Sequence, residues 1–232
     1  MRTLKTIAAS ITVLLMATSA FAQLKKDDIE KLNDAAMVLT ELRNTPEGIP
    51  DSIWSKAHCV LVIPSLKKAG FIVGGEHGSG VMSCRHGSTW GAPVFMEMTK
   101  ASAGLQAGVS STDLVLVVMN EKGAEKLLNN KVTLGADASV AAGPVGRSAS
   151  AATDAQLSAE MLSYSRSKGL FAGVNLSGGS LNPDKSENER AYGPNTSARE
   201  IALGTTPVKM SAELRVFTNA LERETRGTSG VK

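Results

Sequence analysis

The sequence predicts a single α+β domain, in which a strongly bent or barrel-like antiparallel β-sheet is flanked by N- and C-terminal helices. Apolar residues recur at three- and four-residue steps near both ends of the chain, a spacing typical of amphipathic helices. Between the ends, short apolar runs are separated by Gly or Pro, as expected for strands. The 22 glycines and only 4% aromatic residues favour closely approaching, bent strands over a bulky helical core.

Helical segments are expected at residues 24–43, 51–57, 121–130, 197–203 and 208–226. In the first of them, Ile29, Leu32 and Leu39 share one face, and Pro46 with Gly48 ends the helix. This helix carries four positive and five negative charges. We therefore expect it to cover the core, because such a balance is a poor match for an anionic membrane.

Runs of strand length occupy residues 58–63, 71–73, 81–85, 93–98, 102–109 and 114–119. They follow one another too closely to hold helices between them, so an antiparallel meander is expected. The glycine-rich segment 74–80 is interpreted as a flexible hairpin turn. Residues 132–140 alternate cleanly and predict another strand. Residues 161–166 and 170–176 predict a hairpin.

The first 22 residues have the pattern of a secretory signal peptide. Arg2 and Lys5 precede a mostly apolar stretch at residues 7–18, and residues 20–22 (Ala-Phe-Ala) fit the rule for cleavage. The apolar stretch is shorter than the roughly 20 residues that span a bilayer. Cleavage lowers the formal charge from +3 to +1, because it removes two positive charges and no negative ones. We expect an exported protein of the periplasm or the cell exterior, able to lie peripherally on a membrane.

The mature chain then divides into an N-terminal helix and turn at residues 23–48, one main domain at residues 49–226, and a frayed tail at residues 227–232. No internal repeat or linker divides the main domain further.

Neither charge nor motifs point to nucleic acid or to catalysis. A formal charge of +3 is too small an excess to neutralise a phosphate backbone. No serine has glycine two positions away on both sides, and no Gly-Lys pair exists for a phosphate-binding loop. His58, His77 and His86 lack the paired spacing of metal ligands. We therefore predict a protein that is not an enzyme and that uses no cofactor or metal.

Cys59 and Cys84 are the only cysteines. An oxidising compartment favours a disulfide between them. Such a bridge closes a loop of about 25 residues and contributes on the order of 3 kcal/mol. The alternative is two buried free thiols, since Cys59 lies in an apolar run, and only the geometry can decide between them.

Arg147 follows a turn at residues 143–146 (Gly-Pro-Val-Gly) and precedes several hydroxyl side chains. An arginine beside glycine amides and hydroxyls can contact an anion or a phosphate ester. The alternative is that Arg147 caps local carbonyls or pairs with Asp137.

Arg166 and Lys168 lie at the tip of the expected hairpin, beside Leu170 and Phe171. Cations next to an exposed apolar wedge suit an anionic lipid surface. The alternative is an ordinary solvated turn whose Leu and Phe face the core.

With these segments the chain resembles the SYLF family of lipid-binding domains, whose yeast members act with actin. The resemblance runs from about residue 53 to residue 221 and covers nearly the whole mature chain. The motifs that carry it lie at residues 68–71 (Lys-Ala-Gly-Phe), 74–80 (Gly-Gly-Glu-His-Gly-Ser-Gly), 90–93 (Trp-Gly-Ala-Pro), 135–137 with 143–147, and 163–173.

The resemblance implies binding of anionic phospholipids, often phosphoinositides, at a membrane surface and without catalysis. We take Lys67, Lys68, Arg147, Arg166 and Lys168 as candidate head-group contacts. Actin is not an expected partner of an exported chain. The alternative function is a structural or protein-interaction module of the cell envelope without lipid specificity.

Overall fold

The computed structural model describes residues 23–45, 48–70, 73–103, 108–129, 131–146, 158–167 and 170–226. The expected signal peptide and the expected C-terminal tail lie outside these ranges. In the described part of the chain, no helix is both long enough and apolar enough to cross a membrane.

The helices are α1 (Lys26–Arg43), α2 (Asp51–Trp54), α3 (Glu121–Asn129), α5 (Lys185–Tyr192), α6 (Ala198–Ala202) and α7 (Ala212–Thr225). The strands are β1 (Cys59–Gly70), β2 (Val73–His86), β3 (Thr89–Trp90), β4 (Val94–Ala103), β5 (Gly108–Val118), β6 (Val132–Thr133), β7 (Val140–Ala142), β8 (Met161–Ser167), β9 (Leu170–Gly173) and β10 (Gly179–Pro183).

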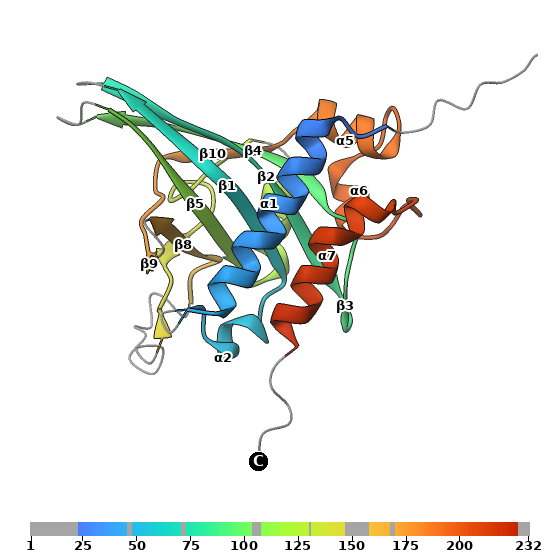
Figure 1. The fold of residues 1–232 in the computed structure, drawn as a ribbon, viewed down its shortest axis with the longest axis horizontal. Helices are drawn as coiled ribbons and strands as arrows, with labels where there is room; N and C mark the ends of the chain where they lie inside the picture. The colour runs from blue at the N-terminus through green and yellow to red at the C-terminus, as the bar shows by residue number, and fades with distance from the viewer. Residues whose placement is uncertain are drawn as a thin grey trace, which may run out of the picture.

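The strands form one curled sheet in the order β6-β10-β4-β2-β1-β5-β8-β7, with β3 paired to β2 and β9 paired to β8. The predicted fold class is confirmed, because this strongly bent sheet is flanked by α1 at one end of the chain and α7 at the other (Figure 1). Two details differ from the expected meander. The β1–β2 hairpin lies between β4 and β5, and β7 pairs with β8 in parallel.

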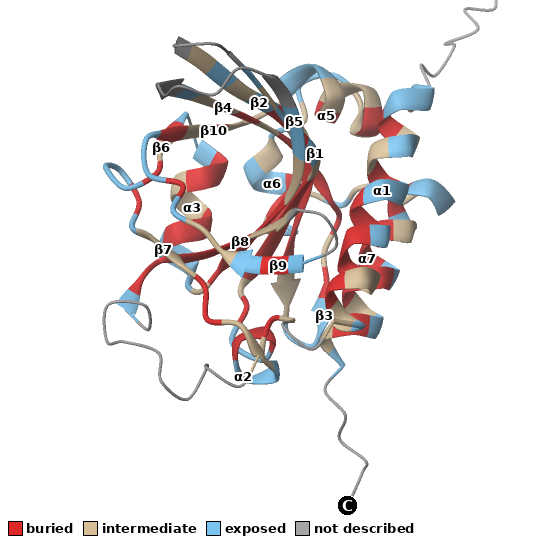
Figure 2. Ribbon diagram, turned by 60° about the vertical axis from the view of Figure 1, so that its left-hand side comes forward, coloured by how far each residue is buried: buried red, intermediate tan, exposed pale blue. Residues whose placement is uncertain are grey.

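Both faces of the central sheet are buried, which explains the continuous apolar run at residues 59–63. Val60 and Val62 face a core shared with α1, α2 and α7. Cys59, Leu61 and Ile63 face a second core shared with α3 and α6. Figure 2 shows the two helical layers on opposite sides of the strands. Helix α1 covers the core as expected, burying residues that include Leu32, Leu39 and Leu42.

The glycine-rich segment 74–80 is part of strand β2, so its interpretation as a hairpin turn was wrong. Two of the glycines are needed because neighbouring atoms approach too closely for a side chain. A Cβ on Gly80 would lie 2.2 Å from the Val62 carbonyl oxygen, and one on Gly78 would lie 2.7 Å from Ile63 Cγ2. Close approach of β1, rather than chain reversal, accounts for these residues.

The prediction of one strand at residues 132–140 was also wrong. The alternation is interrupted by a turn at residues 135–137, where Gly135 has φ +83°. The Asp137 carboxylate accepts a hydrogen bond from the Thr133 amide at 2.7 Å. The two-residue β6 and the three-residue β7 stand where one long strand was expected, because the local aspartate–backbone bond favours a turn.

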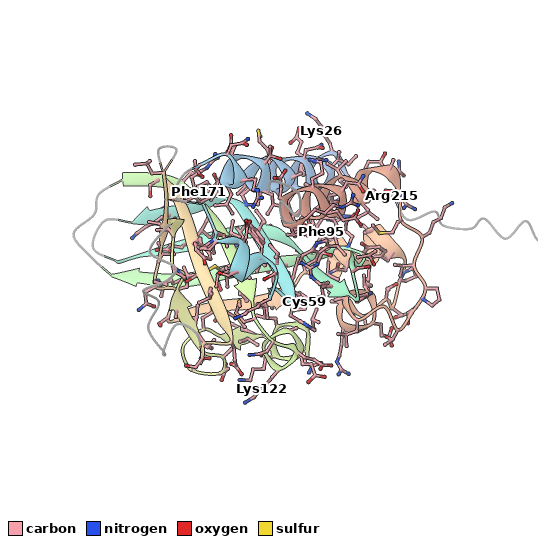
Figure 3. The ribbon with its side chains drawn as sticks, turned by 90° about the horizontal axis from the view of Figure 1, so that it is seen from below. Lys26, Cys59, Phe95, Lys122, Phe171 and Arg215 are labelled. Carbon is pink, nitrogen blue, oxygen red and sulfur yellow. A yellow bond between two sulfur atoms is a disulfide. The ribbon has the colours of Figure 1, made fainter. Side chains whose placement is uncertain are left out.

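Cys59 and Cys84 face each other across β1 and β2 and are joined by a disulfide. Both are almost completely buried in the core beneath α3 and α6. Figure 3 shows Cys59 well inside the molecule, away from the exposed Lys26 and Lys122. The bridge therefore joins two neighbouring strands within a packed core.

Candidate functional site

The ends of four long strands project beyond the helices. We call this region the strand extension; it comprises residues 68–70 of β1, 74–76 of β2, 100–101 of β4 and 110–111 of β5. Figures 1 and 2 both show β1, β2, β4 and β5 reaching past the helical layers. Small residues dominate it, and Ala69, Gly75 and Ala101 lie exposed in one cross-strand row. The polar side chains of the extension are therefore accessible without movement of a helix.

Lys68 and Lys100 lie on one face of the strand extension, on either side of Glu76. Glu76 is the register partner of Lys68 on β1 and of Lys100 on β4, so the three side chains share a face. The Lys68 ammonium lies 3.6 Å from Glu76 Oε1, and Lys100 Nζ donates to the Asn175 carbonyl at 3.5 Å. One carboxylate thus stands between two ammonium groups, which leaves this row with a net charge of +1.

Lys67 lies on the opposite face, because successive strand residues point to opposite sides. It contributes to a groove of about 300 Å³ whose α1 wall carries Asp27, Glu30 and Asp34. Lys31 of α1 lines the same groove, so the three carboxylates face two ammonium groups. The adjacent Lys67 and Lys68 therefore do not form one cationic pair.

Arg166 is held by two carboxylates of the protein. Its Nε donates to Asp113 Oδ2 at 2.7 Å, and Nη1 forms an ion pair with Glu41 of α1. The guanidinium carbon lies 5.8 Å from the centre of the Phe171 ring. The side chain is only 23% exposed, so Arg166 connects β8, β5 and α1, and its charge is compensated internally.

Arg147 and Lys168 lie outside the described residues, so their roles as head-group contacts stay predictions. The segment before Arg147 is fixed at two points. Gly143 leaves no room for a side chain, because a Cβ there would lie 2.0 Å from Tyr164 Cζ. The Gly146 amide donates to the Gly48 carbonyl at 3.1 Å.

The hairpin beyond Arg166 places its two apolar residues differently. Phe171 is buried in the core beneath α1 and α7, whereas Leu170 is 65% exposed. Of the two residues of the expected apolar wedge, Phe171 is therefore part of the core and only Leu170 is exposed.

The cysteines and histidines do not gather into a ligand set. Cys59 and Cys84 are bonded to each other, and a thiolate is the form that binds metal. Within the described ranges, no group of three or more His, Cys, Asp or Glu side chains is placed to hold a metal ion.

Lys100 was missed at the sequence level. Its position near the end of β4 gives no sign that it stands across β2 from Lys68. Only the register of three strands brings the two lysines onto one face. The alternation of side chains along β4 is the signal that could have placed it. Met96 and Met98 are buried, and Lys100 follows them at the same two-residue spacing, so it points to the same side of the sheet.

The fold and this surface define a binding module, an α+β domain whose curled sheet presents a charged strand end. Residues 99–224 match the family model Ysc84, described as a Las17-binding protein actin regulator. The match covers more than half of the chain, which therefore belongs to the Ysc84, or SYLF-domain, family. The resemblance inferred from the motifs is confirmed.

Similar proteins include Protein YSC84 of Saccharomyces cerevisiae, 37% identical over 71% of this chain and 36% of that protein. LAS seventeen-binding protein 3 of the same species is 40% identical over 67% of this chain and 35% of that protein. The human SH3 domain-containing YSC84-like protein 1 is 32% identical over 86% of this chain and 61% of that protein. The alignments thus span about a third of the two yeast proteins.

Proposed function

We propose that the chain binds anionic phospholipid at a membrane surface, without catalysis, through the Lys68–Lys100 face of the strand extension. The observation that carries the proposal is the pairing of Lys68 and Lys100 around Glu76 at a projecting end of the sheet. Two ammonium groups against one carboxylate attract phosphate groups.

The attraction has to be local, because the overall charge is small. The chain has a formal charge of +3, and loss of residues 1–22 would leave +1. A long-range field from so few charges is weak. Each lysine close to an anionic membrane contributes about 1 kcal/mol. The proposal is therefore binding of modest strength that depends on individual lysines.

The membrane in question is one that an exported protein meets. The signal-peptide pattern at residues 1–22 supports a location in the periplasm or outside the cell. Phosphoinositides and actin, which the family resemblance suggests for yeast members, are not proposed as its partners there. The lipid class proposed is an anionic phospholipid of the cell envelope.

Co-sedimentation with liposomes of stated composition tests the proposal. The double variant Lys68→Ala/Lys100→Ala should bind phosphatidylglycerol liposomes about thirtyfold more weakly, since it loses about 2 kcal/mol of attraction at about 1.4 kcal/mol per tenfold. The matched control Lys122→Ala/Lys185→Ala removes two exposed lysines on α3 and α5 and should bind like the original chain. Lys67→Ala should change binding little, because Lys67 lies on the opposite face, in a groove lined by acidic residues of α1.

Equal binding by the two double variants would exclude this face as the lipid contact. The second candidate function, a protein-interaction module, is favoured by the family's description as Las17-binding. This second function would be supported if the folded protein bound none of the anionic liposomes tested.

A further inference from the structure

The far end of strand β2 carries an arginine that has no carboxylate partner among the residues that the structure describes. We propose that Arg85 and the surrounding pocket form a binding site for a phosphate monoester or free phosphate, separate from the strand extension. The pocket has a volume of about 420 Å³, and its walls include Arg85, Ser88, Trp90, Glu222, Thr225 and Arg226. It lies between β2, β3 and the C-terminal end of α7. The size is within the range of small-molecule sites.

The Arg85 guanidinium is held in a fixed orientation. Its carbon atom stacks 4.5 Å from the centre of the Trp90 ring. Its Nε donates to the Ala57 carbonyl and one Nη2 proton to the Trp54 carbonyl, each at 3.3 Å. Trp90 is fixed in turn, because its indole Nε1 donates to Thr225 Oγ1 at 3.0 Å. A stacked, hydrogen-bonded arginine loses little freedom on binding.

Three donors of Arg85 have no partner within the described part of the chain. A guanidinium has five N–H groups, and the two backbone carbonyls use one on Nε and one on Nη2. Among the described residues, Arg85 forms no ion pair with a carboxylate, and burial lowers its pKa. A partly buried cation without a counter-ion is costly, and an oxyanion supplies the missing charge.

The remaining walls are compatible with an anion. Glu222 Oε2 accepts from Nη2 of Arg226 at 3.2 Å, so this carboxylate is already paired. With Arg85 included, the lining carries two guanidinium groups against one carboxylate. Ser88 adds a hydroxyl that can donate to a phosphate oxygen. The planar fork of an arginine fits phosphate with two parallel hydrogen bonds.

This site is distinct from the proposed membrane contact. Arg85 lies nine residues beyond Glu76 on the same strand, a separation of about 30 Å at roughly 3.3 Å per residue. Lys68 and Lys100 therefore cannot share one head group with Arg85. Loss of either site should leave binding at the other unchanged.

Titration followed by nuclear magnetic resonance tests the site. The chain has two tryptophans, and only Trp90 lines the pocket. Inorganic phosphate and glycerol 3-phosphate should each shift the Trp90 indole N–H signal in a saturable way. Sodium chloride at matched ionic strength should not. Arg85→Gln should weaken the affinity at least tenfold, whereas Arg215→Gln, an exposed arginine elsewhere on α7, should not change it.

Two further arms complete the test. Vesicles containing phosphatidic acid show whether the same phosphate group is also accepted on a lipid. If it is not, the ligand is a soluble ester or free phosphate. If Arg85→Gln does not fold, the combined variant Arg85→Lys/Arg226→Gln takes its place. Its affinity for phosphate must then be at least tenfold weaker than that of the original chain. The proposal is wrong if phosphate and chloride act alike, or if a folded variant at Arg85 keeps the original affinity.

Discussion

Arg166 shows how a residue chosen for its charge can have a structural role. On sequence grounds it was a candidate head-group contact. In the structure it bonds to Asp113 of β5 and pairs with Glu41 of α1. Its loss would leave the mostly buried Asp113 carboxylate without its cation.

Arg166→Ala should therefore lower the free energy of unfolding by about 1–3 kcal/mol, the cost of leaving a buried acceptor unpaired. Urea denaturation measures this change. The control Arg223→Ala removes an arginine that is 63% exposed and lies 3.9 Å from its carboxylate, so it should change stability by no more than about 0.5 kcal/mol. Equal stability of the two variants would show that Arg166 is free to bind a ligand.

Residue-level prediction of the site was limited by register. Residue type and neighbours made Lys68 a candidate contact. Lys100 could not be found, because its relation to Lys68 depends on both pairing with Glu76 across β2. A shift of one residue in either pairing would move one lysine to the other face.

At the scale of elements, periodicity predicted the helices α1 and α7 and the hairpin of β8 and β9. Glycine was the main source of error. In segment 74–80 it marks close packing of β2 against β1, and at Gly135 it marks a turn with positive φ. The same residue type serves both needs, and only the neighbouring strands distinguish them.

Helix α1 is joined to α5 by a buried ion-pair network that should respond to pH. The buried Asp28 carboxylate accepts from Arg190 Nη2 at 3.0 Å and from the Lys25 amide at 2.9 Å. Burial alone would raise the pKa of Asp28. Hydrogen bonds from Arg190 and Lys25, with the charge of Lys31, outweigh burial and hold the pKa below its ordinary value of 3.8.

A pKa lowered by folding makes the Asp28 contribution to stability complete above pH 3.8, and that contribution is lost as the pH falls through the folded-state pKa. Asp28→Asn should lower the free energy of unfolding by roughly 1.5–3 kcal/mol near neutral pH. The variant should also lose less stability than the original chain when the pH is lowered into the acid range. Glu187 in the same network acts in the opposite direction, because burial raises its pKa despite Lys31. Thermal unfolding from pH 2 to pH 7 measures both effects. If Asp28→Asn lost as much stability in acid as the original chain, Asp28 would not be the group responsible.

At the scale of the whole molecule, the two proposed binding surfaces lie at opposite ends of β2, and their responses to salt should differ. The Lys68 side chain is 37% exposed, whereas the Arg85 guanidinium stacks on the buried Trp90 ring. Salt screens exposed charges much more than buried ones. Membrane binding should therefore weaken more steeply with salt than phosphate binding at Arg85.

Binding of the original chain to anionic liposomes should fall between low and physiological salt, over which the Debye length shrinks to about 8 Å. The cause is the screening of a few lysines, since a formal charge of +3, or +1 after cleavage, provides no strong overall field. Liposome co-sedimentation at several salt concentrations measures the slope, and Lys68→Ala/Lys100→Ala should reduce it while Lys122→Ala/Lys185→Ala should not. Binding that is equal on neutral and anionic liposomes, and unaffected by salt, would show that apolar contacts rather than these lysines hold the protein at the membrane.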